Sequence, residues 1–348
     1  MTIHLFDFTR EELTAELSRR YGRGWYHAAA LYREVFQRGN PDWHLAPEFV
    51  ASPKLTRPLR EAIDAGIPLP WRTVRDGSVT KLVTRLADGA RIESVVIPGK
   101  GRSTVCVSCQ VGCRMGCAFC ETGRMGFHRD LFPHEIVGQV MTARFRLGAP
   151  IRNVVFMGMG EPFDNFEAVI KAFRVIREPA GLRIAPRHVT VSTAGIVPGI
   201  FRLAEVPPPR PKLAVSVNAG DDATRSRLMP INRRYPMDAL GAALRAYAEA
   251  TGDAIFAEYV LIRGVNDAPA DARALARFLS PFDAKVNLIP CNPGADGEAG
   301  GQAAPPPDAV ARFAGWLVAE GVFVRGRPAR GMGVMAACGQ LGGGGIRG

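Results

Sequence analysis

Residues 106–127 read CVSCQVGCRMGCAFCETGRMGF and hold five of the seven cysteines of the chain. Three of them, Cys113, Cys117 and Cys120, have the spacing C-x3-C-x2-C. One loop with this spacing can present three thiolates to three irons of a small inorganic cluster and leave a fourth iron without a protein ligand. A structural zinc site is closed and would require a second, distant pair of Cys or His ligands, which the sequence does not offer. We therefore expect an iron–sulfur loop with one open iron.

Apolar, strand-like runs alternate with amphipathic helix patterns after this loop. The predicted strands are 154–157, 188–192, 212–217, 255–261, 285–289 and 322–325, and predicted helices between them include 166–176, 237–251, 270–279 and 308–320. Repeated strand-then-helix units require a mainly parallel sheet with helices outside it, and such folds bind ligands at the carboxyl ends of the strands. Roughly six units are visible when the strand leading into the cysteine loop is counted, which predicts an α/β partial barrel.

The residues before the cysteine loop predict two further parts. Residues 9–65 show helical spacing, with a capping-box signature at Thr9 and Glu12, a second helix over 25–37 and a third after Ser52-Pro53. Residues 71–97 instead form short alternating runs with a turn signal at Asp88-Gly89, which indicates paired strands. The chain is therefore expected to begin with a small helical domain and a β-strand extension.

Composition favours a globular cytoplasmic protein. No apolar run approaches the roughly 18 residues that span a bilayer, and residues 1–20 lack the apolar segment of a signal peptide. Clustered cysteines in a long chain indicate a reducing compartment rather than a secreted disulfide framework. The net charge of +11 comes mostly from arginine, which suits a polyanionic partner, although a coding bias toward arginine would give the same charge.

The cysteine motif, with the aromatic Phe119 before its last cysteine, resembles the radical S-adenosylmethionine (SAM) superfamily. The resemblance implies a [4Fe–4S] cluster held by Cys113, Cys117 and Cys120, with the amino and carboxylate groups of SAM on the open iron. It also implies that one electron from the cluster cleaves SAM to a 5′-deoxyadenosyl radical.

Polar residues at the ends of later strands are the candidate SAM contacts. Residues 158–162 (GMGEP) follow a predicted strand, where glycines permit close backbone approach and a carboxylate can accept hydrogen bonds from an ammonium group. Taken alone this is an ordinary strand-to-helix turn, but in a radical SAM chain it resembles the turn that holds the SAM amino group. The full set of candidates, each of which could instead cap a local turn, is Gly160, Glu161, Ser192, Ser216, Val217, Asn218 and Asn292.

Two distant cysteines give a narrower resemblance. Cys106, Cys338 and the runs 104–107 (TVCV), 110–113 (QVGC), 158–162 (GMGEP) and 287–290 (NLIP) are together similar to the RlmN/Cfr family of radical SAM RNA methyltransferases. The match covers about 93–341. It implies an RNA-binding-like helical accessory domain over 1–70, a strand extension over 71–98, a radical SAM core over 99–332, and a C-terminal segment over 333–348 that carries Cys338.

The chemistry explains why the family needs both cysteines. An aromatic C–H carbon of adenine is too weak a nucleophile to take a methyl cation from SAM, whereas a thiolate is strong enough. The resemblance implies that Cys338 takes a methyl group from one SAM and that a radical made from a second SAM abstracts hydrogen from it. The carbon radical then adds to the adenine ring, and Cys106 releases the product by forming a transient disulfide with Cys338. Glu93 matches the family's candidate proton acceptor, although a glutamate on a strand face is more often only solvated.

Several positions depart from the family pattern or have no assigned role. Asn218 stands where members usually have histidine, and residues 330–335 (RGMGVM) lack the acidic residue usual before Ala336. Cys291 is expected to pack in the core. Cys109, where the family has serine, could compete for the disulfide or do nothing. Arginines in predicted loops could bind phosphates around a flipped base, or could simply be solvated; they are Arg225, Arg227, Arg233, Arg234, Arg325, Arg327 and Arg330.

We therefore expect a cytoplasmic, monomeric SAM-dependent methyltransferase that uses two SAM molecules per turnover and an external one-electron donor such as flavodoxin or ferredoxin. The expected product is adenosine methylated at an sp2 carbon, carbon 2, in 23S rRNA and also tRNA. Methylation at carbon 8, as in Cfr, is the alternative within the class. A radical enzyme that modifies a peptide or a small metabolite is the alternative outside it.

Overall fold

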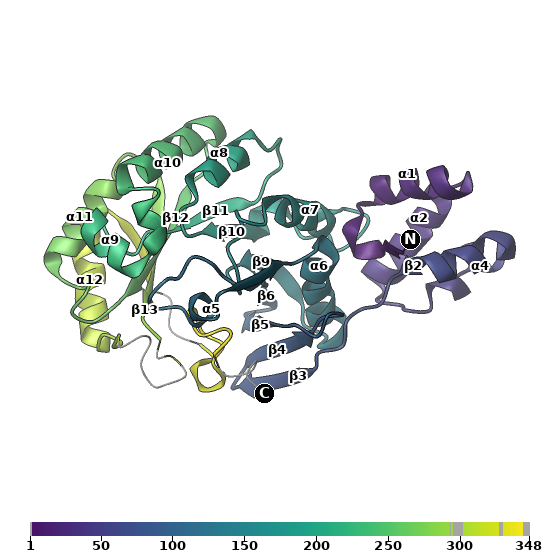
Figure 1. The fold of residues 1–348 in the computed structure, drawn as a ribbon, viewed down its shortest axis with the longest axis horizontal. Coiled ribbons are helices and arrows are strands. Elements are labelled where there is room, and N and C mark those ends of the chain that lie inside the picture. The colour runs from purple at the N-terminus through teal and green to yellow at the C-terminus, as the bar shows by residue number, and fades with distance from the viewer. Residues whose placement is uncertain (1, 293, 295–301, 327–329, 344–348) are drawn as a thin grey trace.

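The computed structural model describes residues 2–292, 294, 302–326 and 330–343. Within these residues a ten-stranded sheet forms the centre, with strand order β14-β13-β12-β11-β10-β9-β6-β5-β4-β3. Figure 1 shows this sheet running through the molecule, with the N-terminal helices projecting at one end. No helix in this part of the chain is long and apolar enough to cross a membrane.

Neighbouring strands from β6 to β14 run parallel and form the partial barrel. They are β6 (Arg102–Cys106), β9 (Ile151–Phe156), β10 (Val189–Thr193), β11 (Lys212–Ser216), β12 (Ile255–Leu261), β13 (Ala284–Pro290) and β14 (Phe323–Gly326). The main helices between them are α6 (Pro133–Met141), α7 (Phe166–Arg177), α8 (Val197–Glu205), α10 (Met237–Thr251), α11 (Pro269–Leu279) and α12 (Pro307–Ala319). The predicted partial barrel is confirmed, and β14 follows the last of the described strand–helix units.

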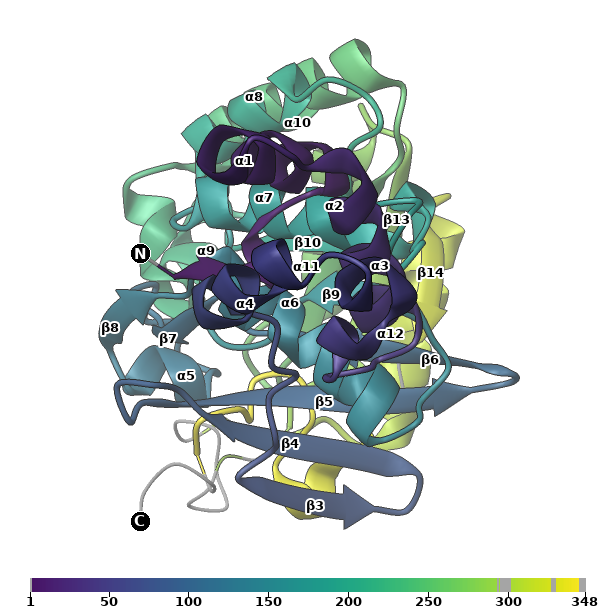
Figure 2. The same ribbon diagram turned by 90° about the vertical axis from the view of Figure 1, so that its right-hand side faces the viewer.

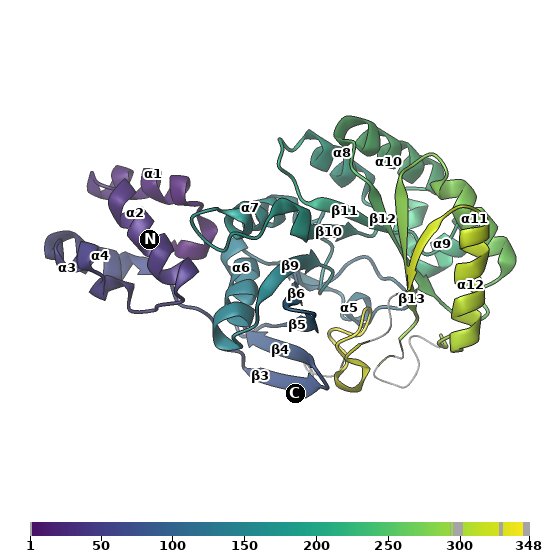
Figure 3. The same cartoon turned by 180° about the vertical axis from the view of Figure 1, so that it is seen from behind.

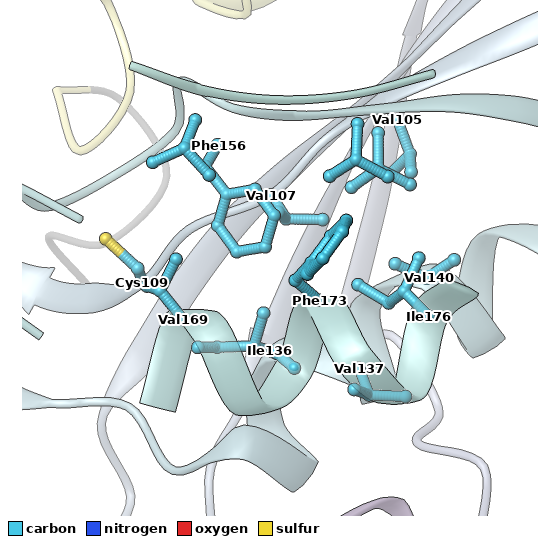
Figure 4. Packing of buried hydrophobic residues seen from close by; sticks show 14 of the residues in the cluster. Val105, Val107, Cys109, Ile136, Val137, Val140, Phe156, Val169, Phe173 and Ile176 are labelled. Carbon is cyan, nitrogen blue, oxygen red and sulfur yellow. The ribbon is translucent and has the colours of Figure 1, made fainter. Parts of the chain in front are cut away.

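Branched and aromatic side chains fill the space between the sheet and its helices. Figure 4 shows Val105 of β6 and Phe156 of β9 meeting Ile136 of α6 and Phe173 of α7. All four side chains are buried, and full burial of such a side chain contributes about 1.5–3 kcal/mol. This packing holds the parallel strands in place, so that their carboxyl ends form one edge of the barrel.

The paired strands predicted over 71–97 are also present. They are β3 (Arg72–Asp76), β4 (Val79–Arg85) and β5 (Arg91–Gly99), and they extend the sheet antiparallel beyond β6. The turn lies at Asp88-Gly89 as predicted, with the Ala90 backbone N–H donating to Asp88 Oδ1 at 3.0 Å. β5 continues through Pro98 because Gly99 pairs with Arg102 of β6. Figure 2 shows these three long strands side by side.

The N-terminal residues form the predicted helices. These are α1 (Arg10–Tyr21), α2 (Trp25–Leu31) continued by η2 (Tyr32–Gln37), η3 (Trp43–Leu45), α3 (Pro47–Val50) and α4 (Pro53–Ala62). The capping box is confirmed, because Thr9 accepts from the backbone N–H of Glu12 and Glu12 accepts from that of Thr9. Two short strands, β1 (Ile3–His4) and β2 (Ile63–Asp64), pair in parallel and were not predicted. Two residues are too few to show a period in the sequence.

The helical part packs against the barrel beside α6 and α7. Asp7, in the short turn η1 (Leu5–Asp7), accepts a 2.7 Å hydrogen bond from the backbone of His134 at the start of α6. Gln37 donates to the carbonyl of Ala180 at 2.7 Å, after the end of α7. Figure 3, seen from behind, shows α6 and α7 between the N-terminal helices and the rest of the barrel. The two parts therefore share one continuous hydrophobic core.

Gly39 offers a test of this junction. Its φ is +66°, and a Cβ there would lie 2.4 Å from the ring of Phe145. We expect Gly39→Ala to lower the free energy of unfolding by about 2–4 kcal/mol, since it combines backbone strain with a clash. Gly22→Ala is the control, because Gly22 has φ +67° but open space around it, and should cost only about 1 kcal/mol. Urea denaturation measures both; equal losses would contradict tight packing at this junction.

Candidate active site

The cysteine loop lies at the carboxyl ends of the parallel strands. It follows β7 (Gln110–Gly112) and precedes α5 (Glu121–Arg124) and β8 (Phe127–Asp130), which pairs with β7. Cys113 and Met115 of the loop pack in a small apolar cluster with residues that follow β10, β12 and β13, namely Ala194, Ile262 and Cys291. The loop therefore occupies the edge of the barrel where a ligand is expected.

The three thiols of the motif lie close to one another. Burial raises the pKa of Cys113 to about 12 and raises the pKa of Cys117 and Cys120 as well. A smaller increase in the pKa of Cys113 and of Cys117 comes from the neighbouring Cys120. Among the described residues, no three His, Cys, Asp or Glu side chains are placed to hold a single metal ion. Three thiolates from one loop, each able to bind a different iron, are the ligand set of a [4Fe–4S] cluster with one open iron, so the residues present fit that group.

The turn after β9 is held in place by Glu161. Its carboxylate accepts backbone hydrogen bonds from Phe163 at 3.0 Å and from Ala194 at 2.7 Å. Burial raises the pKa of Glu161 to about 7, and these hydrogen bonds oppose the increase. A Cβ on Gly160 would lie 2.6 Å from Gln110, so this glycine is required by close packing against β7. Glu161 therefore joins the ends of β9 and β10 beside the cysteine loop.

The candidate residues at the ends of β10 and β11 differ in burial and in the contacts of their side chains. Ser192 and Ser216 are half-buried at the strand ends, and Val217 is fully buried. Asn218 has φ +58°, and its Oδ1 accepts a 2.7 Å hydrogen bond from the backbone of Val260. Its Nδ2 group lies 3.1 Å from the sulfur of Met229. Both polar groups of the Asn218 side chain thus contact the fold itself.

Arg225 is a correction to the predicted set of RNA-facing arginines. The side chain lies in α9 (Asp222–Leu228) and is 0% exposed, so it cannot contact a phosphate. Its guanidinium donates to the carbonyl oxygens of Ala194, Ser216 and Val217 and to Oδ1 of Asn232. Burial lowers the pKa of Arg225 to about 10. The sequence pattern could not separate it from its neighbours, because burial of one arginine in a short helix depends on the tertiary fold.

The other predicted arginines remain candidates by exposure. Arg227, Arg233, Arg234, Arg325 and Arg330 are all exposed. Arg327 lies outside the described residues. Exposure leaves these side chains free to contact a phosphate.

The end of β13 meets the C-terminal segment. Asn292 is buried, and its Nδ2 group donates to the carbonyl oxygen of Cys338 at 3.1 Å. Its Oδ1 atom is buried and has no hydrogen-bond partner in the described part of the chain. A buried acceptor without a donor is costly unless a ligand supplies one. Asn292 therefore fits the predicted contact with the adenosine of SAM.

The segment that carries Cys338 lies between the cysteine loop and the strand extension. On the loop side, the Glu121 backbone N–H donates to the carbonyl of Gly339 at 2.7 Å, and a Cβ on Gly339 would lie 2.8 Å from the carbonyl of Phe119. On the extension side, the Gly333 N–H donates to Asp76 at 3.0 Å. Figure 1 shows this segment in yellow beside α5 and the ends of β3 and β4.

Cys106 and Cys338 are brought together by this arrangement. Cys106 is the last residue of β6 and is buried, whereas Cys338 is exposed. Burial raises the pKa of Cys106 to about 12, and the next contribution to that increase comes from Cys338. An electrostatic effect of this kind requires the two sulfurs to be near each other. The C-terminal cysteine therefore lies near enough to its predicted partner for their charges to interact.

Glu93 is not a solvated strand residue. It lies in β5 and is 0% exposed, and its Oε2 accepts a 2.9 Å hydrogen bond from the backbone of Gly342. Its Oε1 lies 3.1 Å from Nζ of Lys81, which is only 3% exposed. Lys81 was missed by the sequence reasoning. The turn at Asp88-Gly89 was a usable signal, because it sets the β4–β5 register that places Lys81 and Glu93 on one face.

The two remaining cysteines are packing residues. Cys109 is buried in the main core, and Figure 4 shows it near Val107 and Val169. Burial raises the pKa of Cys109 well above its usual value, so its thiol is not poised to compete for a disulfide. Cys291 is buried in the apolar cluster beside the cysteine loop, in agreement with the predicted packing role.

Comparisons with known proteins agree with this geometry. Residues 107–278 match the Radical SAM superfamily. The chain is 39% identical over 340 residues to the probable dual-specificity RNA methyltransferase RlmN 1 of Protochlamydia amoebophila, covering 98% of this chain and 94% of that protein. It is 43% identical over 347 residues to the dual-specificity RNA methyltransferase RlmN of Anaeromyxobacter dehalogenans, covering 95% and 90%. The chain belongs to the RlmN family.

A solved structure supports the same membership. The crystal structure of a radical SAM methyltransferase from Sphaerobacter thermophilus matches with a TM-score of 0.90 and 40% identity, covering 98% of this chain and 99% of that one. The predicted radical SAM barrel with its helical and strand extensions is therefore the fold of this RlmN family member.

Arg225 gives a stability test at this site. We expect Arg225→Ala to lower the free energy of unfolding by about 3–5 kcal/mol, because three backbone carbonyls and Asn232 would lose their donor inside the protein. Arg227→Ala is the matched control, two residues away in α9 and exposed, and should change stability by less than about 0.5 kcal/mol. Urea midpoints of the purified variants give both numbers, and similar midpoints would overturn the structural role of Arg225.

Proposed function

We propose that this protein methylates carbon 2 of an adenosine in 23S rRNA, and also in tRNA, through a methyl-carrying Cys338. The observation that carries the proposal is the packing of the Cys338 segment against the cysteine loop, with Cys338 near enough to Cys106 for their charges to interact. The relatives are named as dual-specificity RNA methyltransferases, which favours an RNA substrate over a peptide or small metabolite. Methylation at carbon 8 is the competing outcome within the same chemistry.

In this proposal the cofactors occupy the edge of the barrel. Cys113, Cys117 and Cys120 hold the [4Fe–4S] cluster, and the SAM contacts are Gly160, Glu161, Ser192, Ser216, Val217, Asn218 and Asn292. When bound, the cluster and two SAM molecules per turnover supply the methyl group and a 5′-deoxyadenosyl radical. Since the side chain of Asn218 already contacts Val260 and Met229, its contribution to SAM binding would come from its backbone or from shaping the site.

Cys338 and Cys106 have different roles in the proposed reaction. The Cys338 thiolate is nucleophilic enough to carry the carbon that adenine cannot take up directly. Cys106 then forms a bond to the Cys338 sulfur while the bond between that sulfur and the carrier carbon breaks. The electron pair of the broken bond stays on the carbon, which takes up a proton, and the methylated base is freed. Because burial raises the pKa of Cys106, its thiol stays protonated until the attack and loses its proton at that step. Glu93 accepts the proton that leaves the adenine ring.

The rest of the chain is assigned to RNA binding and support. Residues 1–70 would form the helical accessory domain that contacts RNA, 71–98 the strand extension, 99–332 the radical SAM core, and 333–348 the segment that carries Cys338. The exposed arginines at the strand ends would neutralise phosphates around a base flipped into the site. We further propose a monomeric cytoplasmic enzyme that receives single electrons from a flavodoxin or ferredoxin.

Mass spectrometry tests the carrier role of Cys338. Protein purified without oxygen is expected to show the mass of one added methylene on the peptide that contains Cys338, because the thiolate is methylated before RNA binds. Cys106→Ala is expected to accumulate a covalent RNA–protein adduct, since no thiol can release the base. Cys109→Ala is the matched control and should leave no adduct. An unmodified Cys338 in protein with a full cluster would remove the carrier mechanism.

Nucleoside mapping tests the target. A strain that lacks the gene is expected to lose 2-methyladenosine from 23S rRNA and tRNA and to regain it on complementation. Loss of 8-methyladenosine instead would select the alternative carbon. Unchanged RNA nucleosides in the deletion strain would contradict RNA methylation as the function.

A further inference from the structure

We propose that Lys81 is a positioning residue that holds Glu93 ready to accept the adenine proton and couples this to docking of the Cys338 segment. This inference rests on the proposed function. Lys81 itself takes no part in the reaction proposed for Cys338, Cys106 and Glu93.

The sheet register places Lys81 beside the reacting groups. Lys81 lies opposite Val95 in the β4–β5 pair, and Val95 lies opposite Cys106 in the β5–β6 pair. Directly opposed residues point to the same face of a sheet, and so do residues two apart on one strand. Lys81, Glu93 and Cys106 therefore share the face on which the C-terminal segment lies.

Both charges of the pair are buried. Lys81 is 3% exposed and Glu93 is 0% exposed, with 3.1 Å between Nζ and Oε1. A buried charge without a partner is strongly unfavourable, and here each side chain is the nearest opposite charge of the other. Other titratable groups near this face are the thiols of Cys106 and Cys338 and the carboxylate of Glu121, which lies beside Gly343.

The same pair holds the C-terminal segment at two points. Nζ of Lys81 donates to the carbonyl of Met335 at 3.3 Å, three residues before Cys338. Oε2 of Glu93 accepts from the backbone of Gly342 at 2.9 Å, four residues after it. Cys338 is thus bracketed by one contact from each member of the ion pair.

This arrangement gives the two contacts of Glu93 different roles. With the segment docked, the carboxylate is fully covered and cannot reach a base. When the Gly342 contact opens, the contact of Oε1 with Lys81 remains and keeps the carboxylate aimed at the place that Gly342 left. The C–H bond of the ring carbon then breaks, its proton goes to Glu93, and its electron pair stays in the ring; the unpaired electron left by the radical addition would pass to the cluster when it is bound.

A lysine that only tied the C-terminal segment to the sheet would make the same contacts with Met335 and Glu93. Buried ion pairs are weak evidence for stability, and apolar residues of the same size often serve as well. The distinguishing feature is pH dependence, because a lysine that only ties down the Met335 carbonyl has no effect on proton transfer. The test therefore follows release of the RNA adduct as a function of pH.

The experiment uses the cluster-loaded full chain, SAM, a one-electron reductant and 23S rRNA from a deletion strain. Adduct release is followed on denaturing gels from mildly acidic to mildly alkaline pH. We expect Lys81→Met to slow release at neutral pH by at least roughly tenfold and to recover as pH rises, because an unpaired buried carboxylate is protonated more readily and a base works only when deprotonated. Lys81→Arg, which keeps the charge, should restore release at neutral pH.

Two further variants keep the test decisive. Asp76→Ala removes another contact with the same segment, the Gly333 hydrogen bond, and should leave the pH profile unchanged. The double variant Lys81→Met/Glu93→Gln removes the uncompensated charge, so it folds even if Lys81→Met does not. Its rate of adduct release should equal that of Glu93→Gln alone at every pH.

The outcomes separate this inference from the proposed function. If Glu93→Gln accumulates adduct while Lys81→Met has the wild-type pH profile, the positioning role of Lys81 is wrong and the proposed function stands. If Lys81→Met only reduces methylation of Cys338, with no change in the pH profile, Lys81 is a structural tie. If Cys338 carries no methyl-derived carbon in any variant, the proposed function itself fails.

Discussion

The candidate active site depends on the docking of the C-terminal segment between the antiparallel strand extension and the cysteine loop. A hydrogen bond from Lys81 to the Met335 carbonyl and one from the Gly342 N–H to the Glu93 carboxylate fix the chain on the two sides of Cys338. A chain end that must reach a buried partner more than two hundred residues away needs such contacts, because its conformational entropy would otherwise keep it apart. The sheet contributes to both sides of this docking site. The strand extension is part of the sheet, and the cysteine loop lies at the carboxyl ends of its parallel strands.

Buried charges around the site are balanced mostly by backbone groups. Arg225 is surrounded by carbonyl oxygens and Glu161 by N–H groups, and both join the ends of neighbouring strands. Such contacts cost less than leaving a charge unpaired, and they make the strand ends rigid. Rigid strand ends keep the side chains of a site in position when a ligand binds, and small displacements of such side chains are costly for catalysis.

The antiparallel extension has a role that its sequence did not reveal. Its strands supply Asp76, Lys81 and Glu93, all of which contact residues 333–342. An added hairpin of this kind is often read as a linker. Here it forms the surface on which the segment with Cys338, the proposed methyl carrier, is placed, and it also presents the predicted proton acceptor.

The sequence by itself determined the partial barrel, the capping box, the hairpin turn and the three cysteines of the loop. These follow from local period, turn chemistry and ligand spacing, which act over a few residues. Only the tertiary structure decided that Arg225 is buried, that Cys109 packs in the core, and that Asn218 contacts the fold. It also decided that Lys81 and Glu93 pair with each other and contact the segment that carries Cys338. Each of these depends on segments far apart in the chain, and burial and partner choice at such distances are set by packing rather than by local pattern.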